Sequence, residues 1–175
     1  MKLGIGASLV LSLVAAEARA DEVQLVDRPD HVTEAHVIVN ASPAQIYDVV
    51  TSYASWPSVF SDIRSVKVER GGREDAEVTF RSRALHDQQV TVKFANVPGR
   101  AVRFRGIKGP PGGSARGEYV MTPIDGGKRT RVDAMLYMDV SGLPSLFVRE
   151  STVRGMRRAK LHADLADLNA HFARR

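Results

Sequence analysis

Apolar and polar residues alternate with a period of two through most of the stretch from 63 to 139. Val78 and Phe80 face one way, for example, while Thr79 and Arg81 face the other. Glycine-rich pairs that interrupt the alternation are typical of hairpin turns. Because clean alternation indicates antiparallel strands with one buried face and one wet face, this stretch predicts a meander of about six strands.

Helical signals flank this meander. A predicted strand at 32–40 leads to Ser42 and Pro43, which suit the N-cap and first position of a short helix, and a second short helix is expected at 56–60. From 145 to 172 the apolar period is 3.6, which predicts one helix about 42 Å long. The predicted fold class is therefore α+β. A curved antiparallel sheet of six to seven strands wraps around a long C-terminal helix, with two short helices after the first strand.

The composition suits one exported domain. The chain has 175 residues, a net charge of +5 and no cysteine, so disulfides, thiolate metal sites and cysteine nucleophiles are excluded. Lys2, an apolar run at 3–16 and the Ala-Arg-Ala that ends at Ala20 have the three-part form of a secretory signal peptide. We therefore expect a signal peptide at 1–20, a single domain at 21–175 and a periplasmic location.

Four short motifs point to a known family. They are Asn40-Ala-Ser-Pro-Ala-Gln-Ile-Tyr-Asp-Val-Val50, Tyr53-Ala-Ser-Trp-Pro57, Gly117-Glu-Tyr-Val-Met-Thr-Pro123 and Gly142-Leu-Pro144. In this order they resemble the START-like superfamily with the helix-grip fold, which includes polyketide cyclases, coenzyme Q-binding proteins and steroidogenic-type lipid-transfer domains. The resemblance covers about 32 to 172 and implies a hydrophobic tunnel between the sheet and the long helix. It implies no particular reaction, because one scaffold hosts many functions.

Candidate ligand-binding residues follow from the inward face of the sheet and the apolar stripe of the last helix. From the residues alone they could equally fill a solid core, and the family resemblance is what favours a lined tunnel. Tyr119, Glu150 and Arg157 are the candidates for a polar contact at its closed end, because a buried charge is costly unless it is paired or used on a ligand. The full set is Phe60, Phe80, Val92, Phe94, Phe104, Tyr119, Met121, Leu136, Met138, Glu150, Val153, Met156 and Arg157.

A glycine- and proline-rich segment at 106–114 is expected to be an irregular loop that cannot continue a strand. Together with the segment around Trp56, it is a candidate gate at the tunnel mouth, as the resemblance implies. The candidate gate residues are Trp56, Gly109, Pro110, Pro111 and Gly112.

Basic residues repeat on the predicted wet face of the sheet: Arg81, Arg83, Lys93, Arg103, Arg105, Arg116 and Arg131. A solvated face is the ordinary explanation, and transient contact with an anionic membrane surface is the alternative. Nucleic acid is not expected as a partner, since no aromatic platforms are interleaved with these charges. We expect a monomer.

The favoured function is periplasmic binding or transfer of a hydrophobic small molecule, such as a lipid, a sterol-like compound or an isoprenoid. The chain lacks HExxH and GxSxG, and no metal site, cofactor or catalytic residue is predicted. A non-catalytic binding domain is favoured over an enzyme. Two alternatives stay open: an enzyme of the polyketide cyclase or aromatase type that uses the same cavity, and a ligand-free accessory of an envelope complex.

Overall fold

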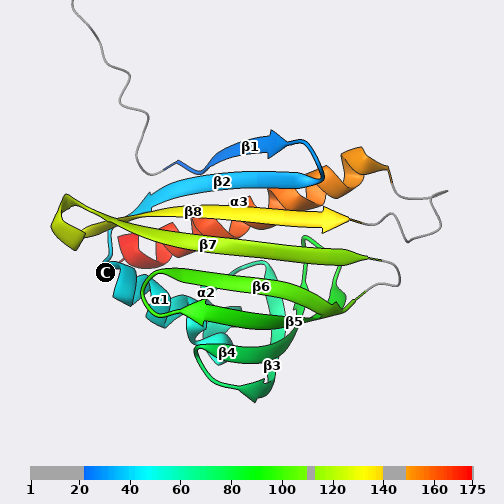
Figure 1. The fold of residues 1–175 in the computed structure, drawn as a ribbon, viewed down its shortest axis with the longest axis horizontal. Helices are drawn as coiled ribbons and strands as arrows, with labels where there is room; N and C mark the ends of the chain where they lie inside the picture. The colour runs from blue at the N-terminus through cyan, green and yellow to red at the C-terminus, as the bar shows by residue number, and fades with distance from the viewer. Residues whose placement is uncertain (1–21, 110–112, 140–148, 175) are drawn as a thin grey trace, which may run out of the picture.

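The eight strands form one antiparallel sheet. The structure is a computed structural model that describes residues 22–109, 113–139 and 149–174. The strand order is β1-β2-β8-β7-β6-β5-β4-β3 (Figure 1). The strands are β1 (Gln24–Arg28), β2 (Val32–Val39), β3 (Ile63–Gly71), β4 (Asp75–Ser82), β5 (Gln88–Val97), β6 (Ala101–Lys108), β7 (Ser114–Ile124) and β8 (Arg129–Asp139). The helices are α1 (Pro43–Thr51), α2 (Trp56–Val59) and α3 (Glu150–Ala173), with 3-10 turns η1 (Tyr53–Ser55) and η2 (Asp125–Gly127).

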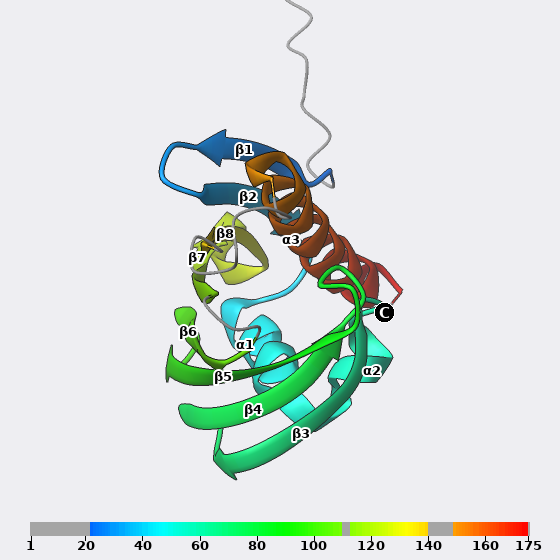
Figure 2. The ribbon, with the colours of Figure 1, turned by 90° about the vertical axis from the view of Figure 1, so that its right-hand side faces the viewer.

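The sheet is strongly curved, and all three helices lie on its concave side. Figure 2 shows the strands bending from β1 and β2 around to β3, while α3 runs along the open side of the curve. The main contacts of α3 with the sheet are with β2 and β8. The helix therefore packs on one half of the sheet, and the half formed by β3 to β6 curves away from it.

The predicted α+β helix-grip fold is confirmed, with a difference at the edge of the sheet. The additional strand is β1, which pairs with β2 from Gln24↔His36 to Arg28↔Val32. Most of β1 is exposed, so its residues carry no alternating apolar pattern that could have marked it as a strand.

The start of α1 follows the expected capping chemistry. The Ser42 Oγ accepts a hydrogen bond from the Gln45 backbone N–H at 3.4 Å, and the Gln45 side chain accepts one from the Ser42 N–H at 2.9 Å. With Pro43 at the first helical position, this is a complete capping box. The Ser-Pro pair therefore predicted the boundary correctly.

One local expectation needs correction. Gly106, Ile107 and Lys108 continue β6 instead of beginning an irregular loop, because β6 still pairs with β5 as far as Thr91↔Lys108. The long helix is continuous from Glu150 to Ala173; its predicted start near 145 lies outside the described residues.

A row of four register partners crosses the sheet through Phe94, Phe104, Gly117 and Leu136. A Cβ atom built on Gly117 would lie 2.4 Å from Cζ of Phe104 and 2.7 Å from the Met135 carbonyl oxygen. Glycine is required here because the Phe104 ring covers the backbone. The space beside Gly117 is therefore filled by an aromatic ring and adds no volume to the inside of the sheet.

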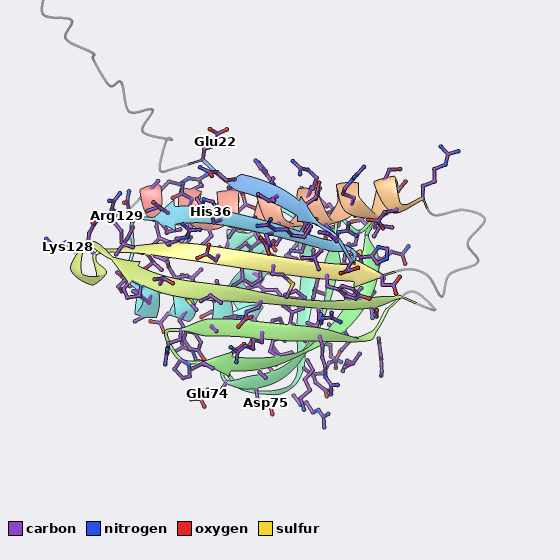
Figure 3. The ribbon with its side chains drawn as sticks, turned by 45° about the horizontal axis from the view of Figure 1, so that its top comes forward. Glu22, His36, Glu74, Asp75, Lys128 and Arg129 are labelled. Carbon is purple, nitrogen blue, oxygen red and sulfur yellow. The ribbon has the colours of Figure 1, made fainter. Side chains whose placement is uncertain are left out.

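Charged side chains occupy turns at the ends of the sheet. Figure 3 shows Lys128 and Arg129 at the turn between β7 and β8, and Glu74 and Asp75 at the turn between β3 and β4. Among the described helices, none is long and apolar enough to cross a membrane.

Candidate ligand-binding cavity

A cavity of about 540 Å³ lies between α3 and the curved half of the sheet. Its lining comes from β3 to β8, from α1 and α2, and from one side of α3. Most of the lining residues are aliphatic or aromatic. The separation between α3 and this half of the sheet, visible in Figure 2, is thus hollow and not filled by side chains.

Aromatic rings form a continuous wall along one side of the cavity. The Trp56 ring contacts Phe80 and Phe94 at centroid distances of 5.8 and 5.7 Å. Phe94 contacts Phe104 at 6.0 Å, and Phe104 contacts Tyr119 at 6.3 Å. Such tilted and edge-on ring pairs are favourable in themselves, and they leave ring faces and edges toward an apolar guest.

The helix α3 presents one line of residues to the cavity. Thr152, Met156, Lys160, Asp164 and Leu168 all line it, spaced four residues apart. Residues at this spacing share a helix face. Lys160 and Asp164 therefore place a charged pair between the apolar Met156 and Leu168, next to a cavity that is otherwise lined mostly by apolar side chains.

Four polar side chains meet at this point: two from α3, one from β7 and one from the segment between α2 and β3. The Tyr119 hydroxyl donates to Oδ2 of Asp164 at 2.6 Å, and the Lys160 ammonium lies 2.5 Å from Oδ1 of the same carboxylate. Lys160 also lies 3.4 Å from Oδ2 of Asp62, which accepts from the Ser82 hydroxyl at 2.6 Å. We call Asp62, Tyr119, Lys160 and Asp164 the polar cluster.

Burial and the neighbouring charges shift the pKa values of the polar cluster. Burial raises the pKa of the Asp164 carboxyl above its ordinary value, and the Lys160 ammonium only partly offsets this. Burial also pushes the pKa of Asp62 upward, but Lys160 and the hydrogen bonds from Ser82 and Ala84 outweigh it, so this pKa lies below its ordinary value. The pKa of Tyr119 is raised well above its ordinary value by burial and by Asp164, so its phenol stays protonated and donates.

The structure brings most of the predicted ligand-binding residues together around the cavity. Nine of them line it: Phe60, Phe80, Val92, Phe94, Phe104, Tyr119, Leu136, Met138 and Met156. Lys160 and Asp164 line it as well but were not among the sequence candidates. A usable signal was present, because both continue the four-residue spacing that starts at Met156.

Four predicted residues lie elsewhere, and their placement as cavity liners is corrected. Met121 packs in the core opposite Val132. Val153 and Arg157 are one position further along α3 than the cavity line, so they face the sheet instead. Glu150 lies at the first position of α3 and is half exposed.

Arg157 and Glu150 form a separate structural contact. Arg157 is 1% exposed and donates to Oε1 of Glu150 at 2.6 Å, to the Met138 carbonyl oxygen at 3.2 Å and to the Thr33 hydroxyl at 3.2 Å. Glu150 also pairs with Nδ1 of His31 at 2.8 Å. These contacts join α3 to β2 and β8, so we call Arg157, Glu150 and His31 the helix anchor.

The candidate gate residues are only partly described. Gly109 lines the cavity, while Pro110, Pro111 and Gly112 lie outside the described residues. Trp56 is 9% exposed, and its ring N–H donates to the Val50 carbonyl oxygen at 3.0 Å. It is therefore a fixed part of the aromatic wall, and a gating movement stays a prediction.

The basic face of the sheet is partly neutralised by its own neighbours. Arg103 pairs with Glu118 at 2.6 Å, and Arg131 pairs with Asp133 at 2.8 Å. The Arg116 guanidinium lies 4.0 Å from the centre of the Tyr137 ring. In the described parts of the chain, no three metal-ligating side chains gather in a way that could hold an ion.

Comparison with known proteins identifies the scaffold. A family model described as polyketide cyclase / dehydrase and lipid transport matches residues 30–173. No curated protein matches the sequence.

Solved structures share the fold at low sequence identity. The Zhui aromatase/cyclase from Streptomyces sp. R1128 is 17% identical with a TM-score of 0.69, and the match covers 88% of this chain and 96% of that one. A START superfamily protein from Mycobacterium smegmatis is also 17% identical, with a TM-score of 0.68 and coverage of 82% and 98%. The human StarD13 lipid transfer and protein localization domain is 13% identical, with a TM-score of 0.63 and coverage of 87% and 89%.

Proposed function

This chain belongs to the polyketide cyclase / dehydrase and lipid transport family, and from that premise we propose that it binds and carries a hydrophobic small molecule in its cavity. The family and the structural neighbours support a START-like domain that either binds a hydrophobic ligand or acts as a polyketide cyclase. The finer proposal is that this domain is a carrier for a lipid, a sterol-like compound or an isoprenoid.

The observation that carries this proposal is the apolar lining of a cavity of about 540 Å³. Each 100 Å² of apolar ligand surface removed from water contributes about 2.5 kcal/mol. Cavities of this size and lining commonly bury most of a small ligand and use a few polar groups to orient it. The polar cluster is the orienting element that the cavity offers.

We further propose that the carrier works in the periplasm. The support is the signal-peptide pattern at 1–20, together with the expected cleavage after Ala20. The net charge of +5 favours brief contact with an anionic membrane surface during loading and release. Fractionation of a Gram-negative host that expresses the full chain, with mass measurement of the product, should find a protein that starts at Asp21 in the periplasmic fraction.

The direct test is native mass spectrometry of the purified protein, combined with binding of the neutral apolar dye N-phenyl-1-naphthylamine. We expect a co-purifying apolar compound and a saturable dye signal. Met156→Trp fills the cavity from α3 and should reduce dye affinity at least tenfold.

Ala159→Trp is the matched control, because Ala159 is exposed on the same helix and does not line the cavity. This variant should bind the dye like the wild type. Absence of any bound apolar compound, together with absence of dye binding, would contradict the carrier proposal.

A cyclase-type enzyme is the second candidate, and the position of the Tyr119 hydroxyl at the cavity, beside Asp164, is the observation that favours it. The phenol can act as a general acid on a carbonyl group of a bound polyketide if its O–H exchanges Asp164 for that carbonyl oxygen. Glu150, which the sequence offered as another polar contact in the tunnel, is engaged in the helix anchor instead. Under the enzyme proposal, Tyr119→Phe keeps dye binding but abolishes turnover of a linear poly-β-ketone substrate.

A further inference from the structure

The polar cluster has a charge that restricts which ligands the cavity can take. Lys160 is its only cation, and it lies within salt-bridge distance of two carboxylates, Asp62 and Asp164. With both carboxylates ionised the cluster carries one net negative charge, and with Asp164 protonated it is neutral. In neither state does it carry positive charge to receive an acidic ligand.

The cluster nevertheless has hydrogen-bonding capacity directed at a guest. An ammonium group has three N–H donors, and the contacts of Lys160 with Asp62 and Asp164 use two of them. A carboxylate has about four acceptor positions, and Asp164 uses one oxygen for Lys160 and the other for Tyr119. Both Lys160 and Asp164 line the cavity, so one donor and further acceptor positions are available beside the apolar space.

A hydroxyl group matches this arrangement. It can accept from the third Lys160 N–H and donate to Asp164 at the same time, which satisfies both charged groups without adding charge. A carboxylate would face the Asp164 oxygens at close range, and in a buried site such like-charge contact is costly. We infer that the cavity selects a neutral apolar ligand with a hydroxyl group at one end, held by Lys160 and Asp164, over the corresponding carboxylic acid.

This inference rests on the proposed function, because it assumes that the cavity binds an apolar guest. Other titratable side chains at the cavity lining are Lys108, His86 and Asp139. Among the described lining residues, Lys108 is the alternative cation that could receive an acid, and it is exposed. The test must therefore distinguish an acid bound at Lys108 from an acid bound at the polar cluster.

The experiment compares 1-dodecanol with dodecanoate at pH 8, where the free acid is ionised. Both compete for N-phenyl-1-naphthylamine bound to the full chain, and the fluorescence of Trp56, the single tryptophan, reports binding independently because its ring lines the cavity. We expect the alcohol to bind at least tenfold more tightly than the acid.

Removing the negative charges should abolish this preference. The double variant Asp62→Asn/Asp164→Asn leaves Lys160 as an uncompensated cation, so dodecanoate affinity should rise and the alcohol-to-acid ratio should fall at least tenfold. Asp164→Asn alone should shift the ratio in the same direction by a smaller factor, and it decides the question if the double variant does not fold. Lys108→Met is the matched control and should leave the ratio unchanged.

The possible outcomes distinguish failure of this inference from failure of the carrier proposal on which it rests. If the dye binds but the alcohol and the acid compete equally, or the ratio follows Lys108 instead of Asp164, the assignment of the polar cluster is overturned while the carrier proposal stands. If neither the dye nor the alcohol binds to the wild type, both fall together.

Discussion

The helix anchor and the polar cluster are two groups of charged residues on the same helix, and they have opposite surroundings. Arg157 in the anchor faces β2 and β8, and the donors of its guanidinium are used by Glu150, Thr33 and Met138. Lys160 is less than one turn further along, but it faces the cavity. The Arg157 side chain is enclosed by protein, while its partner Glu150 reaches the surface, whereas the polar cluster borders the cavity.

This difference shows that a buried charge is not by itself a sign of function. In the anchor, the Arg157 guanidinium bonds to Glu150, Thr33 and Met138 and holds the helix against the sheet, away from the cavity lining. In the polar cluster, the same kind of ion pairing leaves hydrogen-bonding positions that face an apolar void. What distinguishes the two is their direction on α3: Arg157 and Lys160 are three positions apart, which places their side chains about 60° apart around the helix axis.

The largest loss of stability is expected from a substitution in the helix anchor. Arg157→Ala removes a fully buried side chain and leaves the Met138 carbonyl and the Thr33 hydroxyl without this donor. We expect a loss of about 3 kcal/mol in the free energy of unfolding, measured by urea denaturation with Trp56 fluorescence. Dye affinity of the folded fraction should stay within twofold of the wild type.

Arg158→Ala provides the matched control for this prediction. Arg158 is the next residue of α3, and its pair with Asp27 is partly exposed. Its loss should lower the free energy of unfolding by less than about 1 kcal/mol. Equal losses for Arg157→Ala and Arg158→Ala would show that the anchor is not a structural element.

A second and smaller effect is expected at the polar cluster. In Lys160→Met the carboxyls of Asp62 and Asp164 lose their shared cation, so the folded state resists their ionisation. An acid whose pKa is raised by folding costs stability as the pH rises from its unfolded pKa toward its folded one. The variant should therefore match the wild type near pH 3 and lie about 2 kcal/mol below it at pH 7, measured by urea midpoints.

The double variant Lys160→Met/Asp164→Leu sharpens this prediction. Replacing a buried ion pair by apolar residues of similar size is often nearly neutral. Its free energy of unfolding should return to within about 1 kcal/mol of the wild type, while its preference for dodecanol over dodecanoate is lost. A pH-independent loss in the single variant would show instead that packing, and not charge, accounts for the effect.

The sequence was sufficient to predict the scaffold, because scaffold elements depend on local rules. Alternation along β4 and β5 marked their buried faces, and the Ser42-Pro43 pair marked the start of α1. The apolar lining was predicted in large part for the same reason, since Phe80, Val92 and Phe94 must all point to the concave side.

The polar part of the cavity could not be predicted in the same way. On α3, Met156 and Arg157 are neighbours in sequence, and only the position of the helix on β2 and β8 decides which of them faces the void. Asp62 is distant in sequence from Lys160 and meets it only through tertiary packing. Gly106 and Gly117 appear equivalent in sequence, but Gly106 lines the cavity while the Phe104 ring covers Gly117.

The smallest expected effect is a pH dependence at the anchor, which separates its charge from its packing. The hydrogen bond from Arg157 is the main reason that the pKa of Glu150 lies below its ordinary value. Such a group adds stability above its unfolded pKa, near 4.5, and this stability is lost as the pH falls through the folded pKa. Because Glu150 is half exposed, Glu150→Gln should lower the free energy of unfolding by only about 0.5 kcal/mol at pH 7, and the difference should vanish by pH 3 in urea titrations. A difference that persists at pH 3 would mean that Glu150 acts through its shape at the start of α3 and not through its charge.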